Sequence, residues 1–214
     1  MIKITLVLIS VLTLMSCTTI SPVAPDNAPI RSWQQRQQDL ANITSWEING
    51  RIFLRTKKEG QQLNLRWVRH GDHHQIDLTG PLSIGHVRLT RDPDSAKLVA
   101  DDKTYQAQDA EQLLADVIGA RLPVNGLDYW IRGLPAPDAT SEQTLDYRNR
   151  LQQLRQSEWE ILYQSYTRVG ELELPRTIFI KRVASFMNTD AEDIELRLAI
   201  SSWIQPKKMG SQTK

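Results

Sequence analysis

The sequence predicts an α+β fold in which one antiparallel sheet of nine or ten strands carries about three helices on a single face. Apolar and polar residues alternate with period two through most of the chain, which is typical of antiparallel strands with one apolar and one solvated face. Polar spacers of hairpin length separate these stretches. Helical periodicity is confined to a segment near residue 31 and to 109–134. This order has no strand–helix–strand alternation, so it excludes a Rossmann-like or barrel enzyme architecture.

The first predicted helix runs from Arg31 to Thr44, where Trp33, Gln37 and Leu40 recur on one face. After it the period changes to two. Six strands are predicted within the ranges 48–54, 63–67, 76–78, 87–89, 96–99 and 103–106. Polar turns at 57–60, 70–73 and 101–102 join them into a meander.

Two helices are predicted to follow this meander. Asp109 is a suitable N-cap, with Gln112 as its capping-box partner, and Gly119 suits the C-terminal end. A second, shorter helix is predicted to open at Pro123 and to stop at Gly133. The last third of the chain returns to strands, within the ranges 147–154, 159–166, 174–180 and 194–203.

The N-terminus has the pattern of an export signal that ends on the one cysteine of the chain. Lys3 gives a positive start, residues 4–14 are almost wholly apolar, and Met15-Ser16 leads into Cys17. A charged region, an apolar region of about 7–15 residues and a small residue before the cut define a secretory signal peptide. The apolar stretch is shorter than the roughly 20 residues that a membrane-spanning helix needs. Because the signal ends on cysteine, it resembles the lipobox of bacterial lipoproteins; a plain signal with an incidental cysteine is the alternative.

We expect four regions along the chain: a signal peptide over 1–16, a lipidated cysteine with a flexible tether over 17–30, a folded domain over 31–204 and a disordered tail over 205–214. Removal of the signal takes away Lys3 and leaves 25 basic against 25 acidic residues. A neutral chain without a basic patch argues against nucleic acid as a partner. If Cys17 is lipidated, no thiol remains for a disulfide, so the core alone must stabilise the domain.

Residues with catalytic or metal-binding chemistry are few and poorly grouped. His70, His73 and His74 lie at one predicted turn, where neighbouring side chains rarely converge on a zinc ion, and we interpret them as solvated turn residues. The aspartates between 92 and 102 lack the glycine and glutamate of a calcium-binding loop. The sequence contains no nucleophile elbow, phosphate-binding glycine loop or zinc-protease helix motif. We therefore predict no catalytic residue, no metal and no cofactor.

The apolar face of the predicted sheet holds most of the functional information. Trp67 and Trp159 share the apolar phase of their strands, and Trp130 lies on the apolar face of a helix. These residues fit either a filled aromatic core or an apolar cavity between a curved sheet and its helices, and the sequence leaves both open. A cavity would be lined by the residues on the apolar phase of strands and helix: Ile48, Ile52, Leu63, Leu65, Trp67, Ile76, Leu78, Trp130, Leu196 and Leu198.

Several stretches, in their order and spacing, resemble the LolB family of outer-membrane lipoprotein receptors. They are Trp46-Glu-Ile-Asn-Gly50-Arg51, Leu65-Arg-Trp67, Leu78-Thr-Gly80-Pro81-Leu82, Leu122-Pro-Val124, Leu127-Asp-Tyr-Trp130-Ile-Arg-Gly133, Trp159-Glu-Ile-Leu-Tyr163 and Leu174-Pro175. The resemblance runs from about Trp33 to Trp203. It implies a half-open antiparallel β-barrel with helices covering an apolar cavity. It also implies a non-enzymatic, monomeric receptor that accepts acylated lipoproteins from a LolA-like periplasmic carrier and inserts them into the outer membrane without ATP.

The same resemblance assigns roles to particular residues. Cys17 is the lipid anchor, and Thr18 after it points to the periplasmic face of the outer membrane. The family's insertion leucine maps onto Leu82, in an apolar turn with Pro81 and Ile84. Family loops often have glycine after that leucine, where this chain has serine. Two other classes stay open from the residues alone: a scaffold lipoprotein with a filled core, and a lipid-anchored hydrolase.

Overall fold

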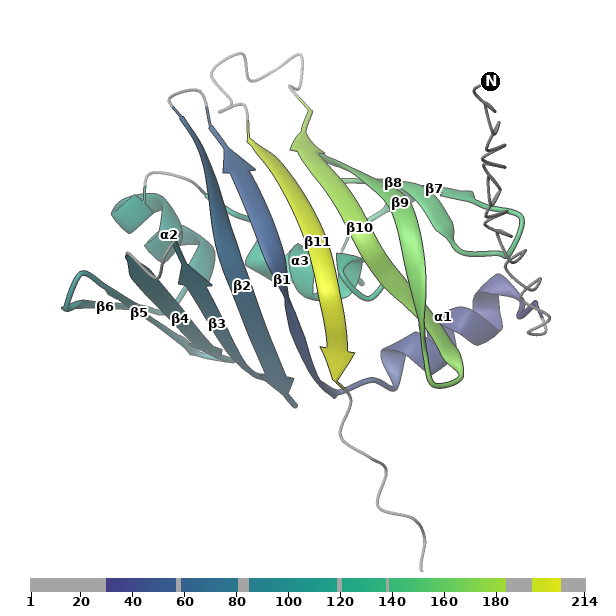
Figure 1. Cartoon of the computed structure of the whole chain (residues 1–214), viewed down its shortest axis with the longest axis horizontal. Coiled ribbons are helices and arrows are strands. Elements are labelled where there is room, and N and C mark those ends of the chain that lie inside the picture. Colours follow the sequence, from purple (N-terminus) through teal and green to yellow (C-terminus); the bar gives the residue numbers. More distant parts are fainter. Residues whose placement is uncertain are drawn as a thin grey trace, which may run out of the picture.

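The computed structural model describes residues 30–56, 59–80, 85–118, 121–137, 139–183 and 194–204 (Figure 1). Its helices are α1 (Trp33–Ala41), α2 (Ala110–Ile118) and α3 (Val124–Trp130). Its strands are β1 (Ser45–Arg55), β2 (Gly60–His70), β3 (His73–Thr79), β4 (His86–Asp92), β5 (Ser95–Ala100), β6 (Lys103–Ala107), β7 (Ser141–Leu145), β8 (Leu151–Gln156), β9 (Trp159–Val169), β10 (Leu172–Arg182) and β11 (Glu195–Ile204). The predicted α+β class is confirmed, with 11 strands instead of nine or ten.

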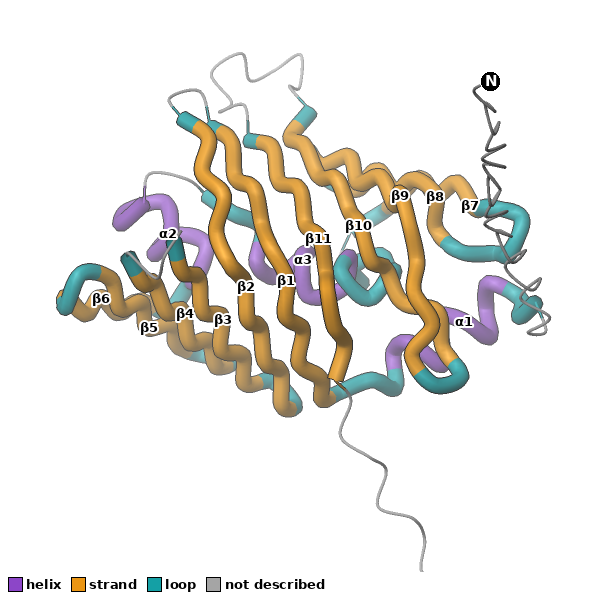
Figure 2. The backbone as a smooth tube through the Cα atoms, viewed as in Figure 1, coloured by secondary structure: helices purple, strands orange, loops and turns teal. Residues whose placement is uncertain are grey.

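The strands form one curved, unclosed antiparallel sheet in the order β6-β5-β4-β3-β2-β1-β11-β10-β9-β8-β7. Two meanders, one from each half of the chain, meet where the first strand pairs with the last (Figure 2). All three helices lie behind the sheet in this view, so one face is covered and the other is open. None of the helices in the described ranges is long and apolar enough to cross a membrane.

The N-cap predicted at Asp109 is confirmed, whereas its predicted capping-box partner Gln112 bonds to Asp116 instead. Ser32 caps α1 and forms a full capping box with Gln35. The Asp109 carboxylate accepts from the backbone N–H groups of Glu111 and Gln112 at the start of α2. These contacts satisfy N–H groups that a helix leaves without an intrahelical partner.

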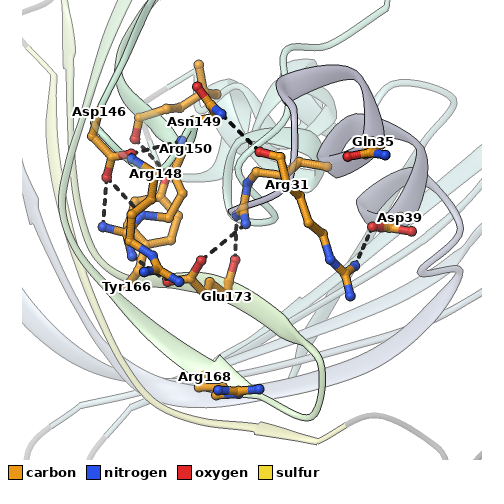
Figure 3. Close-up of polar contacts among 12 residues, drawn as sticks. Arg31, Gln35, Asp39, Asp146, Arg148, Asn149, Arg150, Tyr166, Arg168 and Glu173 are labelled. Carbon is orange, nitrogen blue, oxygen red and sulfur yellow. Dashed lines mark hydrogen bonds and ion pairs between the residues drawn. The ribbon is translucent and has the colours of Figure 1, made fainter. Parts of the chain in front are cut away.

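A cluster of charged side chains ties α1 to the far half of the sheet (Figure 3). Arg36 donates to the carbonyl of Glu173 on β10 at 2.9 Å, and Arg148 and Arg150 donate to the Glu173 carboxylate at 3.1 and 2.7 Å. The side chains of the three arginines are 6, 8 and 15% exposed. Removing one partner from such a buried group leaves uncompensated charge, so the cluster fixes where α1 lies.

The sequence interpretation is wrong over 147–154, which is not one strand. Residues 146–150 form a tight turn between β7 and β8 instead. The Asp146 carboxylate accepts from the backbone N–H groups of Arg148 and Arg150, and Asn149 has a φ of 56°. Asp and Asn favour this geometry because their short side chains bond to the local backbone. The strand before the turn, β7, was not predicted because it is short and mostly polar.

Two irregularities lie in the middle of the sheet. The β1–β11 register shifts between Asn49 and Gly50. A Cβ at Gly50 would lie 2.3 Å from the Ala199 carbonyl oxygen, so this position requires glycine. The β10–β9 register shifts on both sides of Thr177, next to Pro175, which has no N–H to donate. The β10–β11 ladder pairs Thr177–Lys181 with Glu195–Ala199, and beyond Thr177 the two strands diverge (Figure 1).

Candidate functional site

The covered face of the sheet carries apolar rows that run from strand to strand. Cross-strand pairing joins Trp203, Ile48, Trp67, Ile76, Leu89 and Leu98 into one row. A second row contains Leu63, Ile52, Leu198, Ile178 and Tyr163. A third contains Leu54, Leu196, Ile180, Ile161 and Leu154. The predicted lining residues on strands all belong to such rows. Successive side chains of a strand point to opposite faces of the sheet, so every second residue lies on the covered face.

Most of the predicted lining residues are buried in the common core between sheet and helices. Ile48 and Leu196 are 0% exposed, and Ile52, Leu65, Trp67, Ile76, Trp130 and Leu198 are also buried. Leu63 and Leu78 are half-buried. An acyl chain or other apolar ligand that reached the deepest of these residues would have to separate the helices from the sheet.

Five half-buried apolar residues lie together at one end of β1 to β5. Leu54, Leu63, Leu78, Val87 and Ala100 lie at the ends of β1 to β5 nearest the turns at 57–58 and 81–84. The β3–β4 connection is closed at its base by a bond from the Gly80 N–H to the Gly85 carbonyl at 3.1 Å. The apolar face is therefore partly exposed beside this connection. Pro81, Leu82 and Ile84 within it, and Cys17, lie outside the described residues.

Trp130 lies over the other half of the sheet from the aliphatic rows of β1 to β3. Its ring is 6.2 Å from that of Trp159, and its indole N–H donates to the Gln156 side-chain oxygen at 2.9 Å. Tyr163 in turn donates its hydroxyl to the Trp130 carbonyl at 3.0 Å. Trp130 thus anchors α3 to β8 and β9.

A buried ion pair holds the other side of α3. Arg132 donates to the Asp128 carboxylate at 3.4 Å and to the carbonyls of Leu40 and Ile43 at the end of α1. Arg69 on β2 donates to the same carboxylate at 3.1 Å. Burial lowers the pKa of Arg132, and the Asp128 charge beside it opposes that change. The pair fixes α3 against both α1 and the sheet.

Two tryptophans of the row that carries Ile48, Trp67 and Trp203, both contact Trp46. The Trp46 ring lies 5.4 Å from Trp67 and 5.7 Å from Trp203, both with edge-to-face geometry. Such pairs contribute about 0.5–1.5 kcal/mol beyond their buried area. Trp46, Leu89, Leu98 and Trp203 belong to the apolar face but were absent from the predicted lining. Their alternation along the strands was the signal that could have identified them.

His74 is not a solvated turn residue, so that interpretation is wrong. Its side chain is 1% exposed, and its Nδ1 accepts from the Trp67 indole at 3.2 Å. Its Nε2 lies 2.9 Å from an Arg91 guanidinium nitrogen. Burial, followed by the charge of Arg91, lowers the pKa of His74 to about 3. A neutral His74 therefore orients Trp67 in the apolar face; His70 and His73 remain exposed.

The side chains of the covered face are predominantly apolar. No group of three or more His, Cys, Asp or Glu side chains within the described ranges is placed to hold a metal ion. The covered face offers aliphatic and aromatic side chains with a few fixed polar contacts, which is the usual composition of a site for an apolar ligand.

Solved structures with low sequence identity share this fold. A LolA superfamily protein from Nitrosomonas europaea matches with a TM-score of 0.50 and 9% identity, over 82% of this chain and 94% of that one. An outer membrane lipoprotein-sorting protein domain from Vibrio parahaemolyticus, described as putative, matches with a TM-score of 0.53 and 8% identity, over 83% and 92% of the two chains. These similarities concern the curved sheet and its covering helices.

Sequence relatives match far more closely. The outer-membrane lipoprotein LolB of Pseudomonas syringae pv. syringae is 37% identical over 179 residues, which cover 83% of this chain and 82% of that protein. The LolB protein of Pseudomonas putida is 34% identical over 181 residues, or 84% and 83% of the two chains. The family model described as outer membrane lipoprotein LolB matches residues 44–203, nearly the whole sheet with all but the first helix. The chain therefore belongs to the outer-membrane lipoprotein LolB family.

Proposed function

We propose that the covered apolar face binds the acyl chains of lipoproteins that a LolA-like periplasmic carrier delivers. The observation that carries this proposal is the set of continuous aliphatic rows between sheet and helices, which includes Ile48, Ile52 and Leu198. Membership of the LolB family supports a receptor at the outer membrane. The acyl chains would occupy the interior once the helices move away from the sheet.

Entry is proposed at the end of the sheet that carries the β3–β4 connection. The apolar side chains at this end of the strands, such as Leu63, Leu78 and Val87, are half-buried. An acyl chain can contact these residues first, before the deeply buried ones. Leu82 lies in the same connection and is proposed to enter the bilayer during release, with Pro81 and Ile84 beside it.

Transfer without ATP is physically reasonable. Three acyl chains contain roughly 45 methylenes, and each is worth about 0.8 kcal/mol when buried. A bilayer offers about the same stabilisation, so the receptor and the membrane differ by small amounts. Small differences in affinity can then set the direction from carrier to receptor to membrane.

Cys17 is proposed to anchor the protein without taking part in transfer. One acyl chain gives marginal membrane affinity, whereas two or more anchor a protein stably. The twelve residues from Thr18 to Pro29 can span at most about 40 Å, which keeps the domain near its membrane. We further propose that the receptor acts as a monomer and that it catalyses no reaction.

Acceptance of a labelled lipoprotein tests this function. A Cys17→Ala chain, exported by an ordinary signal peptide, is mixed with the carrier loaded with radiolabelled lipoprotein, and the two proteins are then separated. We expect the label to move to the Cys17→Ala protein, and mass spectrometry to find acyl chains in it. A folded protein that takes no label would contradict the receptor function and favour a scaffold lipoprotein. Cleavage of the acyl chains during the assay would favour a hydrolase.

A further inference from the structure

The open face of the sheet contains a hollow that the acyl-binding function does not use. It has a volume of about 900 Å³, and its lining residues lie on β1 to β4 and on β9 to β11, including the region where β10 and β11 diverge. Small residues, Ser165, Thr177 and Ala199, line its end over β9, β10 and β11. Its polar lining is Asn49, Arg51, Asn64, Arg66, Asp77, Thr79, His86, Arg88, Arg176 and Ser201.

The charges around the hollow are unbalanced toward the positive. Four arginines line it against one aspartate, Asp77. That carboxylate already accepts from Arg88 at 2.6 Å, from Gln75 at 2.7 Å and from His86 at 3.1 Å. Arg66 is also engaged, because it donates twice to Glu47 at 2.9 Å.

Two of the arginines have no acidic partner among the residues that the structure describes. Arg51 and Arg176 are both exposed. Arg176 is the residue skipped by the β10–β9 pairing, between Pro175 and Thr177, and such bulges commonly redirect a side chain. The two arginines lie on strands that β11 separates, so their backbones are about 10 Å apart. The hollow therefore presents two separate guanidinium groups, with the hydroxyls of Thr177 and Ser201 and the amides of Asn49 and Asn64 in the same lining.

We propose that this hollow binds an extended, acidic segment of a partner polypeptide. Where β10 and β11 diverge, each strand lacks the other as a backbone partner, and extended peptides bind such unpaired edges. Asn49, Asn64 and Thr177 supply side-chain donors and acceptors, and Arg51 and Arg176 pair with acidic side chains. A membrane surface fits less well, since none of the strongly exposed large hydrophobic residues in the described ranges lies in the lining. The inference goes beyond acyl binding, because it concerns the opposite face.

The test measures peptide binding to the full-length protein anchored in phosphatidylcholine vesicles. The probe is a short fluorescent peptide of glycine, serine and aspartate, and its control has asparagine in place of aspartate. We expect the acidic peptide to bind and the neutral one to bind far more weakly. Arg51→Gln combined with Arg176→Gln should weaken binding by about tenfold, the effect of two charge pairs at exposed sites.

The matched control is Lys97→Gln combined with Lys103→Gln, which removes the same charge from exposed positions on β5 and β6. It should leave peptide binding within twofold of the natural protein. Equal binding by both double variants, or equal binding of both peptides, would overturn the proposal.

Displacement of the peptide by phosphatidylglycerol vesicles, but not by phosphatidylcholine, would assign the hollow to a lipid headgroup instead. Lipoprotein acceptance is measured on the same samples and should be unchanged, so failure of one proposal is distinguishable from failure of the other.

Discussion

The indole N–H of Trp203 on β11 donates a hydrogen bond of 2.9 Å to the carbonyl of Pro175 on β10. The bond crosses the gap where the two strands no longer pair. It gives the Pro175 carbonyl a partner from β11 across this gap. The gap is thus bridged on the covered face by the same tryptophan that packs against Trp46.

Trp203→Phe should destabilise the protein more than Trp46→Phe. Both changes remove the same volume from a buried position, but the Trp46 indole N–H has no hydrogen-bond partner in the described part of the chain. Trp203→Phe alone removes a buried hydrogen bond, which costs about 0.5–1.5 kcal/mol. Urea unfolding of the two variants gives the comparison. Equal free energies of unfolding would show that the bond across the gap contributes nothing.

Leu65→Glu should abolish acyl binding and reduce the free energy of unfolding by several kcal/mol. Leu65 is 6% exposed on the covered face, and an unpaired charge there is expensive. Gln62→Glu adds the same charge at an exposed position of the same strand and should leave both properties nearly unchanged. Thermal unfolding and transfer from the loaded carrier measure the two effects. A folded Leu65→Glu protein that still accepts lipoprotein would remove Leu65 from the site.

Leu82→Glu should block delivery to membranes and leave acceptance intact. Burial of one leucine among acyl chains gains roughly 1.5–3 kcal/mol, and a glutamate loses that gain. The loaded receptor should therefore accumulate. Radiolabelled lipoprotein and liposomes measure acceptance and incorporation separately. Normal incorporation, or loss of both steps together, would show that Leu82 is not an insertion residue.

The free energy of unfolding should fall as the pH falls from 6.5 toward 5, because of His74. The pKa of His74 is about 3 in the folded protein, against an ordinary value of 6.5. Below 6.5 the unfolded chain therefore binds a proton that the folded protein does not, which costs up to about 1.4 kcal/mol per pH unit. His74→Gln should flatten this slope. Above pH 6.5 His74 is mostly neutral in both the folded and the unfolded chain, so its charge does not affect the free energy of unfolding there. Urea unfolding at several pH values measures it; an unchanged slope in His74→Gln would assign the loss to other groups.

Glu173→Gln should loosen α1 and cost about 3 kcal/mol, because three largely buried arginines lose their shared carboxylate. Arg31→Gln is the control. Its pair with Asp39 is 32 and 39% exposed at the two side chains, so its loss should cost less than about 1 kcal/mol. Hydrogen exchange of the α1 amides, together with urea unfolding, reports both changes. Protection of α1 that is equal in the two variants would argue against the cluster as the attachment of this helix.

Strands with a clean alternation of apolar and polar residues could be predicted from the sequence. Features that depend on contacts between distant segments of the chain could not. The rows through Ile48 and Ile52 follow directly from period two, so nine of the ten proposed lining residues could be placed on one face. The burial of His74 depends on Trp67 and Arg91, which the turn pattern does not reveal. The lining of the hollow on the open face includes Gly50 and Thr177, where the register shifts, and alternation alone does not predict a bulge. Whether the covered face opens into a cavity remains a prediction.

The pairing of β1 with β11 has a consequence for how the chain reaches its folded state. The central ladder joins the first and last strands of the domain, so the two half-sheets cannot unite until residues 195–204 are available. Contacts between such distant parts of a chain form slowly, because a long loop must close first. A chain cut before Glu195 would leave β1 and β10 as two unpaired edges in the middle of the sheet. Unpaired edges of this kind promote aggregation, so a chain that lacks the final strand should aggregate more readily than the complete domain.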